Sequence, residues 1–432
     1  MPPPTTLRAG AQIEVGIEGL GFMGDGIAPV GGARVAVPLA LPGERWRVRL
    51  EGETKGLWRA TPLVCLAPAP ERQVPPCPHF GACGGCRLQH LPGDAYAALK
   101  RRRITGALRA RRINAPEPLP TARSPLGSRR RLRLALDEDM RPGFRRPRSN
   151  EAIAVDVCPI TRPELVARLA PLGQALAGLD RLKPGDEAEI ALVGGGVDLL
   201  LLTKASPSDG DRRRLIRLAE AADLDRIALR WPGGAEIAVG RRPLRLVIGA
   251  AAVEPPPGAF LQATAEGASA LTAFADAHLP RGAAVLDLFA GLGTFALALA
   301  RNGRRLHAVE ADPAMTAALE AAARAAGLPV TAEVRDLHRR PLPPAALDRH
   351  DAVLLDPPRA GAEAQAKALA DSRVARVVYA SCDPATFARD AAPLVRAGFR
   401  LEALLPVDQF LYAAEIELIA AFARAPTAIK GA

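Results

Sequence analysis

The sequence predicts a multi-domain protein that combines a small all-β domain, a central α+β region and a C-terminal α/β domain. Two observations lead to this prediction. Residues 11–64 hold short alternating apolar stretches broken by Gly and Pro–Gly turns, which is typical of small β-domains. From about residue 256 onward, apolar runs alternate with segments of helical periodicity, which predicts a doubly wound parallel sheet with a hairpin-like final strand. A chain of 432 residues has room for two or three domains, and we expect them at 1–67, 68–255 and 256–432.

The N-terminal segment is expected to form an OB-like β-barrel of roughly five short strands. Barrels of this type often bind oligonucleotides, although a purely structural β-module would show the same pattern. A proline-rich joint follows at 68–78. Residues 94–113 then carry apolar side chains at helical spacing with arginines between them, which predicts a basic amphipathic helix. Residues 124–255 mix predicted strands and helices, including a strand in "NEAIAVDVCPI".

The charge of the chain is positive and unevenly distributed. The formal net charge is +11, and arginines cluster in the first third of the chain, at 101–103, 109–112, 129–133 and 145–148. A local basic patch is what a polyanion such as RNA would require, although a solvated basic surface would look similar. No run of about eighteen uncharged apolar residues occurs, and the N-terminus does not resemble a signal peptide, so we expect no membrane span and a cytoplasmic location.

Four of the six cysteines show the pattern of a metal site. Cys77, Cys83 and Cys86 are spaced C-x5-C-x2-C, and Cys158 could supply a fourth thiolate. Four thiolates suit either an iron–sulfur cluster or tetrahedral zinc. Zinc sites usually show two close pairs, whereas here three ligands are close and one is remote, so we favour a [4Fe-4S] cluster. Cys65 is expected to be structural.

A glycine turn in the C-terminal domain predicts a nucleotide-type ligand. "VLDLFAGLGTF" places Asp287 at a strand end and Gly291 and Gly293 in the turn before a helix, where glycine lets a backbone approach a ligand closely. Glu310 ends the next strand and can accept hydrogen bonds from ribose hydroxyls. The turn lacks the third glycine of a pyrophosphate seat. It resembles the first motif of class I methyltransferases, so S-adenosylmethionine is favoured over a dinucleotide, with an ordinary tight turn as the alternative.

Two further strands end in reactive residues. "LLDPPRAG" puts Asp356 at the carboxyl edge of the sheet, and "SCDP" puts Cys382 on the same edge. A lone cysteine is usually inert and buried, but one beside a methyl donor suggests methylation of a uracil carbon. A thiolate that adds to C6 of uracil makes C5 nucleophilic, and positive charge from Arg359 or Arg389 could lower the pKa of that thiol.

A base must then remove the C5 proton. "AEIELIAAF" offers Glu415 and Glu417, two residues apart in a predicted strand and therefore on one face, although a solvated strand face is the ordinary alternative.

Taken together, these motifs resemble the RNA 5-methyluridine methyltransferase family over nearly the whole chain. The similarity is greatest to the 23S ribosomal RNA (uracil-5-)-methyltransferase branch, which carries an RNA-binding TRAM domain and an iron–sulfur cluster. The segments that carry it are "GLGFMGDGIA", "CPHFGACGGCRLQHL", "DVCPI", "FLQAT", "DLFAGLGTF", "VEA", "DPPRAG", "SCDPATFARD" and "DQFLYAAEIE".

The resemblance implies a role for individual residues. Cys382 would be the nucleophile and Glu417, rather than Glu415, the base. The residues expected to bind S-adenosylmethionine are Gln262, Phe289, Gly291, Gly293, Glu310, Asp336 and Asp356. The cluster ligands would be Cys77, Cys83, Cys86 and Cys158, with a structural role for the cluster because this chemistry needs no redox step.

The expected partner is RNA, with 23S ribosomal RNA favoured, transfer RNA as the alternative and the enzyme acting as a monomer. A non-catalytic RNA-binding or assembly factor on the same fold is the remaining alternative. The sequence departs from the family pattern at Thr264 and Thr294, which stand where the family has asparagine, and in "LYAAE", which lacks histidine.

Overall fold

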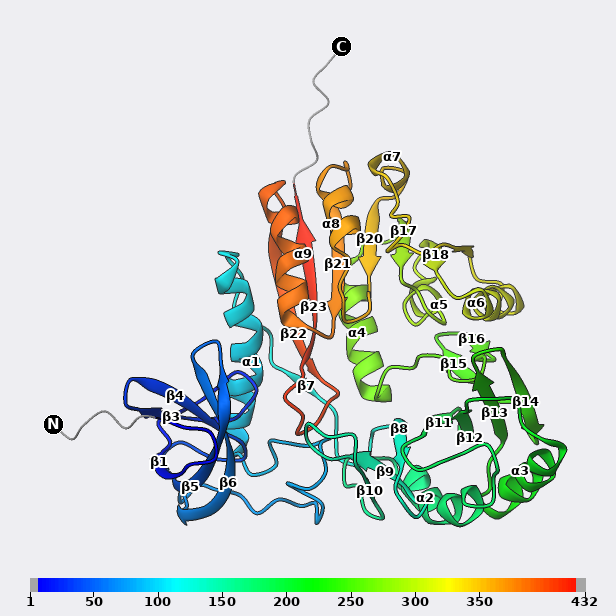
Figure 1. Ribbon diagram of the computed structural model, residues 1–432. Helices are drawn as coiled ribbons and strands as arrows, with labels where there is room; N and C mark the ends of the chain where they lie inside the picture. The colour runs from blue at the N-terminus through cyan, green and yellow to red at the C-terminus, as the bar shows by residue number, and fades with distance from the viewer. Residues whose placement is uncertain (1–6, 425–432) are drawn as a thin grey trace. The chain divides into compact units, whose positions relative to one another are not determined.

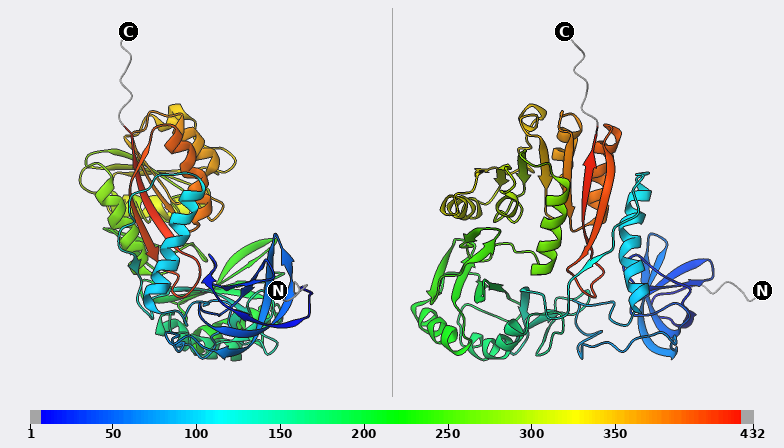
Figure 2. Two further views of the ribbon diagram at one scale, coloured as in Figure 1. Left: turned by 90° about the vertical axis from the view of Figure 1, so that its left-hand side faces the viewer. Right: turned by 180° about the vertical axis from the view of Figure 1, so that it is seen from behind.

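The computed structural model describes residues 7–424, which divide into two compact units (Figures 1 and 2). The first unit holds the residues up to Arg103 together with Tyr412–Glu415. The second holds Ile104–Leu411 and the residues from Ile416 onward. Within 7–424, no helix has both the length and the apolar character that crossing a membrane requires.

The first unit is built on a six-stranded sheet with the strand order β1-β5-β6-β4-β3-β2. Its strands are β1 (Gln12–Gly16), β2 (Gly19–Leu20), β3 (Gly26–Val30), β4 (Ala33–Val37), β5 (Arg45–Thr54) and β6 (Leu57–Ala67). All pairs are antiparallel except β4 with β6. In β5 the residues alternate between buried and exposed, so that Trp46, Val48 and Leu50 enter a small core while arginines face outward. The predicted N-terminal β-sheet domain is confirmed.

Helix α1 (Gly93–Ala110) confirms the basic helix predicted over 94–113. In the first unit, Tyr96 and Leu99 pack with Leu88 and Leu91 in a satellite core. The long loop between β6 and α1 contains the three closely spaced cysteines.

The second unit contains a central seven-stranded sheet in the order β10-β9-β8-β11-β12-β13-β14. The strands are β8 (Arg131–Leu136), β9 (Pro142–Arg145), β10 (Ala152–Ala154), β11 (Glu187–Val193), β12 (Gly196–Leu202), β13 (Arg226–Trp231) and β14 (Gly234–Gly240). The helices α2 (Pro163–Leu176) and α3 (Asp209–Ala221) contribute leucines to the core of this sheet. A short hairpin, β15 (Leu246–Ile248) and β16 (Ala251–Val253), follows it.

The strand predicted in "NEAIAVDVCPI" is shorter than expected. Only Ala152–Ala154 pair with a neighbouring strand, and Cys158 lies beyond them in a turn. The backbone N–H of Thr161 donates to the Cys158 carbonyl at 3.1 Å and closes that turn. Pro159 has no N–H to offer a sheet, so the ladder cannot extend through this segment.

The C-terminal part carries an eight-stranded sheet in the order β19-β18-β17-β20-β21-β23-β22-β7. The strands are β7 (Ala122–Arg123), β17 (Ala284–Leu288), β18 (Arg305–Glu310), β19 (Val330–Val334), β20 (Ala352–Leu355), β21 (Arg376–Ser381), β22 (Arg400–Asp408) and β23 (Glu417–Ala423). The pairs from β19 to β21 are parallel, and β23 is antiparallel to both β21 and β22. This Rossmann-like topology confirms the predicted doubly wound parallel sheet with its hairpin-like final strand.

Helices cover both faces of this sheet. They are α4 (Ala265–His278), α5 (Ala296–Leu299), α6 (Pro313–Ala325), α7 (Pro344–Leu347), α8 (Glu363–Ala370) and α9 (Pro384–Arg396). Figure 1 shows α8 and α9 on one face, and the view from behind in Figure 2 shows α4 on the other. Alternate residues of each strand enter separate cores, so that Val378 packs with α4 and Tyr379 with α9.

Two of these helices begin with the same dipeptide. Asp312 and Asp383 are N-caps whose side chains accept hydrogen bonds from the backbone N–H groups of the first turn, and a proline follows each of them. Proline suits the first helical position because its missing N–H would have no partner there. The "DP" after Cys382 therefore fixes the point at which the chain leaves β21 and enters α9.

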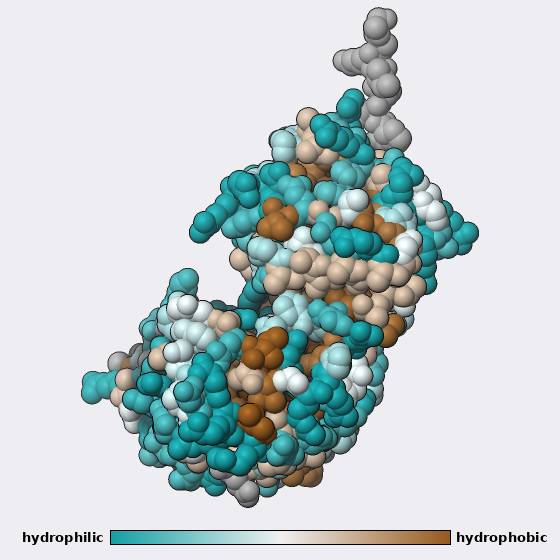
Figure 3. All heavy atoms as spheres, turned by 90° about the vertical axis from the view of Figure 1, so that its right-hand side faces the viewer, coloured by the Kyte–Doolittle hydropathy of each residue, from teal (hydrophilic) through white to brown (hydrophobic). Residues whose placement is uncertain are grey.

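The surface seen in Figure 3 is mostly hydrophilic, with apolar side chains gathered in patches. Large hydrophobic side chains exposed in the second unit include Ile216, Ile237, Val247 and Phe260. Apolar groups of this kind occur on most protein surfaces, and they indicate no site without a further observation.

Candidate active site

The turn after β17 is shaped by residues in a left-handed backbone conformation. Phe289, Gly291 and Gly293 have φ angles of +63°, +57° and +82°. A Cβ atom added at Gly291 would meet nothing within 4 Å, whereas one at Gly293 would come within 2.8 Å of Leu319 Cδ1 in α6. The two glycines therefore have different structural roles, because Gly291 borders open space and Gly293 lets the turn pack against a helix.

Asp287 lies beneath this turn and is fully buried in β17. Its Oδ2 accepts a hydrogen bond from the backbone N–H of Ala296 at 2.9 Å, while Oδ1 is buried without a hydrogen-bond partner. Burial, together with the nearby Asp356 and Glu310 carboxylates, raises the pKa of Asp287 well above its usual value. A buried polar atom without a partner is costly, so Asp287 Oδ1 is a candidate to pair with a polar group of a bound ligand.

Glu310, at the end of β18, borders the same turn. Its Oε2 accepts from the Gly291 N–H at 2.9 Å, and its Oε1 accepts from the N–H groups of Ala311 at 2.7 Å and Asp312 at 2.9 Å. A carboxylate held in this way at the edge of a parallel sheet can accept hydrogen bonds from ribose hydroxyls.

Asp336 and an aromatic pair complete this side of the site. Asp336 Oδ1 accepts from the backbone N–H groups of His338 at 3.0 Å and Arg339 at 3.2 Å. The ring of His338 lies 5.3 Å from the ring of Phe289, at an angle of 50°. Aromatic faces next to a carboxylate suit an adenine base. Gly291, Glu310, Phe289 and the unpartnered Asp287 Oδ1 together fit S-adenosylmethionine. Sequence reasoning missed His338, because no motif marks it.

A second group of residues forms a buried hydrogen-bonded chain. Gln262 Nε2 donates to Asp356 Oδ2 at 3.1 Å, just beyond the end of β20. Gln409 Nε2 donates to Gln262 Oε1 at 2.7 Å and also to Glu417 Oε2. Two amides therefore join the half-buried Asp356 to the buried Glu417, and Gln262 reaches the expected base Glu417 only through Gln409.

The members of this hydrogen-bonded group were only partly predictable from the sequence. Gln262, Asp356 and Glu417 were expected from motifs, whereas Gln409 was missed, although it immediately follows the last residue of β22. Glu417 begins β23, while Glu415 lies outside that strand, so the prediction that both share one strand face is wrong. The backbone carbonyl of Glu415 instead accepts a hydrogen bond from Lys100 Nζ within the first unit.

Burial governs the titration of the three reactive groups. It raises the pKa of Asp356 to about 7, with a hydrogen bond from Gln262 acting in the opposite direction. It also raises the pKa of Glu417 well above its usual value, an effect to which Asp356 adds. The pKa of the Cys382 thiol is raised to about 11 by burial first and then by the negative charges of Glu417, Asp356 and Asp383. The mutual effects of these groups show that Cys382, Glu417 and Asp356 lie together.

The expectation that arginine lowers the pKa of Cys382 is therefore wrong. Arg359 Nε lies 3.6 Å from Asp383 Oδ2. Arg389 Nε donates to Asp390 Oδ1 at 2.7 Å, and the Arg389 guanidinium also lies 3.5 Å from Glu363. Both cations are thus directed at carboxylates, and the field at the thiol is set by acids.

The cysteines of the predicted cluster occupy loops in both units. The backbone N–H of Cys77 donates to Gln89 Oε1 at 3.2 Å, and Cys83 Sγ accepts from the Gly85 N–H at 3.4 Å. In the second unit, Cys158 Sγ accepts from Thr161 Oγ1 at 3.2 Å. Hydrogen bonds to sulfur are common around thiolate ligands. Over residues 7–424, however, no three or more His, Cys, Asp or Glu side chains are arranged to hold a metal ion.

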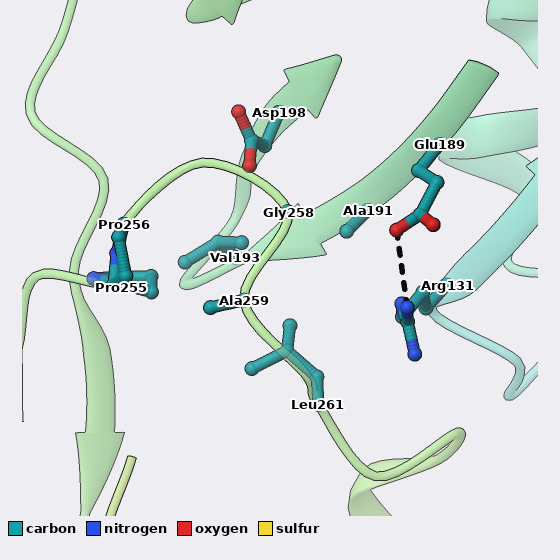
Figure 4. A pocket seen from close by; sticks show the side chains of 10 residues that line it. All are labelled: Arg131, Glu189, Ala191, Val193, Asp198, Pro255, Pro256, Gly258, Ala259 and Leu261. Atoms are coloured by element: carbon teal, nitrogen blue, oxygen red, sulfur yellow. Dashed lines mark hydrogen bonds and ion pairs between the residues drawn. The ribbon is translucent and has the colours of Figure 1, made fainter. Parts of the chain in front are cut away.

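A separate pocket lies between the central sheet and residues 255–261 (Figure 4). Its Glu189 is paired with Arg131 at 3.0 Å, and its Asp198 is paired with Arg226 at 2.8 Å. None of the predicted site residues lines it. Both of its carboxylates are thus paired with arginines, and it lies apart from the predicted site.

Comparison with known proteins agrees with this geometry. Residues 330–423 match the family model "tRNA (Uracil-5-)-methyltransferase", and residues 271–376 match "Conserved hypothetical protein 95". Uncharacterized RNA methyltransferases of Brucella suis and Caulobacter vibrioides are 41% and 39% identical, covering 94% of this chain and 97% and 99% of their own. The 23S rRNA (uracil(1939)-C(5))-methyltransferase RlmD of Chromohalobacter salexigens is 37% identical, covering 93% of this chain and 87% of its own.

A solved structure shares the fold. The tRNA (uracil-54, C5)-methyltransferase of Pyrococcus abyssi, in complex with S-adenosyl-L-homocysteine, superposes with a TM-score of 0.74 at 23% identity. It covers 95% of this chain and 99% of its own. The near-complete coverage by relatives, together with a site suited to S-adenosylmethionine, leads to one conclusion: the chain belongs to the RNA (uracil-5-)-methyltransferase family and is an S-adenosylmethionine-dependent enzyme of that family.

Proposed function

We propose that this enzyme methylates C5 of a uridine in 23S ribosomal RNA through a covalent bond between Cys382 and C6 of the base. The observation that carries the proposal is the group of Cys382, Glu417 and Asp356 at the carboxyl edge of the sheet, in which Gln262 and Gln409 connect the two carboxyl groups and both act on the thiol. A thiol and a buried base side by side are what addition and elimination at uracil require.

The chemistry balances with these groups. The Cys382 thiol releases its proton to solvent, and the sulfur forms a bond to C6 while the electrons of the C5=C6 double bond move toward C5. S-adenosylmethionine supplies a methyl group on a sulfonium, which leaves as a neutral thioether. C5 forms the new bond to that methyl carbon. Glu417 then takes the proton from C5, the C–H electrons restore the double bond, and the C6–S bond breaks to release Cys382.

We propose that S-adenosylmethionine is bound by residues of the glycine turn and by the hydrogen-bonded pair Gln262 and Asp356. Gly291 and Glu310 would approach the ribose, and Phe289 and Asp336 the adenine. Gly293 shapes the turn. Gln262 and Asp356 would stand where the methyl donor meets the base.

The choice of 23S ribosomal RNA rests on the relatives. The Chromohalobacter salexigens protein, whose name specifies 23S rRNA, is 37% identical over nearly the whole chain, whereas the Pyrococcus abyssi tRNA enzyme is 23% identical. We propose that residues 1–67 act as a TRAM-like RNA-binding domain, that 68–255 form a central domain with the iron–sulfur site, and that 256–432 form the methyltransferase domain. Arginine-rich segments would contact the RNA phosphates, so that the target uridine can unstack and enter the active site.

The test uses 5-fluorouridine RNA. Fluorine cannot be removed as a proton, so wild-type enzyme with S-adenosylmethionine should stall as a covalent adduct with 23S RNA that survives denaturing electrophoresis. Cys382→Ala should form none, while Cys65→Ala, which changes a half-buried cysteine in β6, should behave as wild type. An adduct with transfer RNA alone would reverse the substrate assignment. An adduct that persists in Cys382→Ala would exclude this residue as the nucleophile.

We further propose a [4Fe-4S] cluster held by Cys77, Cys83, Cys86 and Cys158. This ligand assignment is supported by the spacing of the cysteines and by the hydrogen bonds to the sulfur atoms of Cys83 and Cys158. Such a cluster would stabilise the fold, because a bound metal group stabilises the folded state by its binding free energy.

Anaerobic preparation followed by iron and acid-labile sulfide analysis tests the cluster. Wild type should contain about four of each per chain. Cys83→Ser should lose most of both, and Cys65→Ser should retain them. Zinc in place of iron in anaerobically reconstituted protein would support the tetrahedral alternative.

A further inference from the structure

The most informative residue without an assigned role is Gln409, which lies in the segment "DQFLYAAEIE". It follows the last residue of β22, and it is 2% exposed. Its side chain contacts Gln262, Thr264 and the proposed base Glu417. It therefore contacts both Gln262 and Glu417, and we assign it no direct reaction with the uracil base.

A backbone group determines how the Gln409 amide is oriented. The N–H of Thr264 points at Gln409 Oε1 over 3.4 Å, and a backbone N–H can only donate. The oxygen of the Gln409 amide must therefore face Thr264, and its NH₂ group must face Gln262 Oε1 and Glu417 Oε2. Consequently Gln262 presents its own NH₂ to Asp356. One backbone donor thus fixes the direction of every hydrogen bond between the two carboxyl groups.

The packing around Gln409 leaves this amide little freedom. A Cβ atom added at Gly267, in the first turn of α4, would lie 2.9 Å from both Gln409 Cβ and Gln409 Oε1. The hydroxyl of Thr264 accepts from the Gly267 N–H at 3.0 Å and shares a 2.7 Å hydrogen bond with Ser124. The N-terminus of α4 is therefore fitted against the Gln409 side chain.

We propose that Gln409 is a positioning residue, which holds the Glu417 carboxylate through Oε2 and leaves Oε1 to accept the C5 proton of the uridine. This proposal rests on the proposed function of Glu417. The same amide ties Glu417 to Gln262, so that the base is aligned with the group that contacts Asp356.

The electrostatic setting supports this assignment. Burial and the neighbouring Asp356 both favour the neutral form of Glu417, which cannot take a proton. The Cys382 thiol also interacts with the Glu417 carboxyl group. A hydrogen bond donated by Gln409 stabilises the ionised carboxylate and opposes both effects.

The test separates proton removal from the earlier steps. Gln409→Met keeps the length of the side chain and removes the donor. Loss of a hydrogen bond to a charged group should slow release of product about 10- to 100-fold. With ordinary uridine RNA, the Cys382-linked, C5-methylated species should then accumulate and be seen by denaturing electrophoresis. The rate of adduct formation with 5-fluorouridine RNA should stay near that of wild type, because that adduct requires no proton removal.

The pH profile gives a second readout. Without the donor, Glu417 should ionise only at higher pH, so the acid limb of the turnover profile of Gln409→Met should move to higher pH. Gln365→Met is a matched control, because Gln365 is also a buried amide, which accepts from the Leu342 N–H at 2.9 Å and donates to the Leu342 carbonyl at 3.1 Å. It should lower stability without accumulation of the methylated adduct.

The outcomes are distinguishable. Failure of wild type to form the 5-fluorouridine adduct would overturn the proposed function itself. The role of Gln409 alone would be overturned by a different result. In that case wild type forms the adduct, but Gln409→Met turns over without accumulating the methylated adduct and keeps the pH profile of wild type. Equal loss of adduct formation and turnover in Gln409→Met would mean that the residue only supports the fold, and would also overturn that role.

Discussion

The backbone N–H of Gly291 donates to Glu310 Oε2 at 2.9 Å and ties the glycine turn to the end of the neighbouring strand. A ribose that binds here would share this carboxylate. Glu310→Gln keeps the shape of the side chain but loses its charge, and we expect the affinity for S-adenosylmethionine to fall about 10- to 100-fold. Calorimetric titration would measure the change. Glu220→Gln, an exposed position in α3, should leave the affinity unaltered.

The two glycines of the turn should separate stability from binding. Gly293→Ala would place Cβ 2.8 Å from Leu319 Cδ1 at a φ of +82°, so the clash of about 1–3 kcal/mol should add to a backbone strain of about 1–2 kcal/mol in urea unfolding. Gly291→Ala meets no atom within 4 Å and should cost only about 1–2 kcal/mol, because its φ is also positive. Its main effect should be weaker binding of S-adenosylmethionine. Equal unfolding midpoints for the two variants would contradict this division.

Alkylation should report the raised pKa of Cys382. Because burial and the neighbouring acids raise this pKa to about 11, labelling by iodoacetamide should be slow at neutral pH and accelerate with each pH unit up to that value. Glu417→Gln removes one source of negative charge, so it should lower the thiol pKa and increase the labelling rate at alkaline pH. Mass spectrometry of the Cys382 peptide measures both. A labelling rate that is already maximal near neutrality would argue against the acidic environment.

Asp356 should make stability fall with increasing pH. Its pKa is raised from 3.8 to about 7 by burial, so between these values the folded state binds more protons than the unfolded state. Stability from the protonated form is therefore complete below the unfolded pKa and is lost as the pH rises through about 7. Asp356→Asn should flatten this decline in urea unfolding midpoints measured from acid to neutral pH. An identical slope in the variant would contradict the shift.

Asp390 should be a strong determinant of stability although it is not proposed to be catalytic. It is fully buried, it accepts from Tyr379 Oη at 2.7 Å and from the Ala362 N–H at 2.6 Å, and it is paired with Arg389. Asp390→Ala would leave those donors unpaired and should cost about 3–5 kcal/mol, whereas Tyr379→Phe should cost about 1 kcal/mol. Chemical denaturation would measure both. The pKa of the Tyr379 phenol is raised by burial and by the Asp390 charge, so the phenol should stay neutral at alkaline pH.

The local elements and the order of the motifs could be predicted from the sequence alone. Alternating apolar runs predict both the N-terminal sheet and the parallel sheet, because side chains on a strand repeat every two residues and those on a helix about every 3.6. The strand-end positions of Glu310, Asp356 and Cys382 follow from the same logic. The carboxyl ends of parallel strands lie at one edge of the sheet, so these residues were expected to lie close together although they are far apart in sequence.

How these residues act on each other depends on contacts that form when the chain folds. The sequence could not show what Gln409 contacts, because the Thr264 N–H that donates to its amide oxygen lies 145 positions away. The charges around Cys382 were predicted with the wrong sign, because a sequence gives the number of arginines but not their partners. Arg359 and Arg389 are directed at Asp383 and Asp390, and burial decides the titration of the thiol. Electrostatic energy depends on distance and on exclusion of water, and both exist only once the chain has folded.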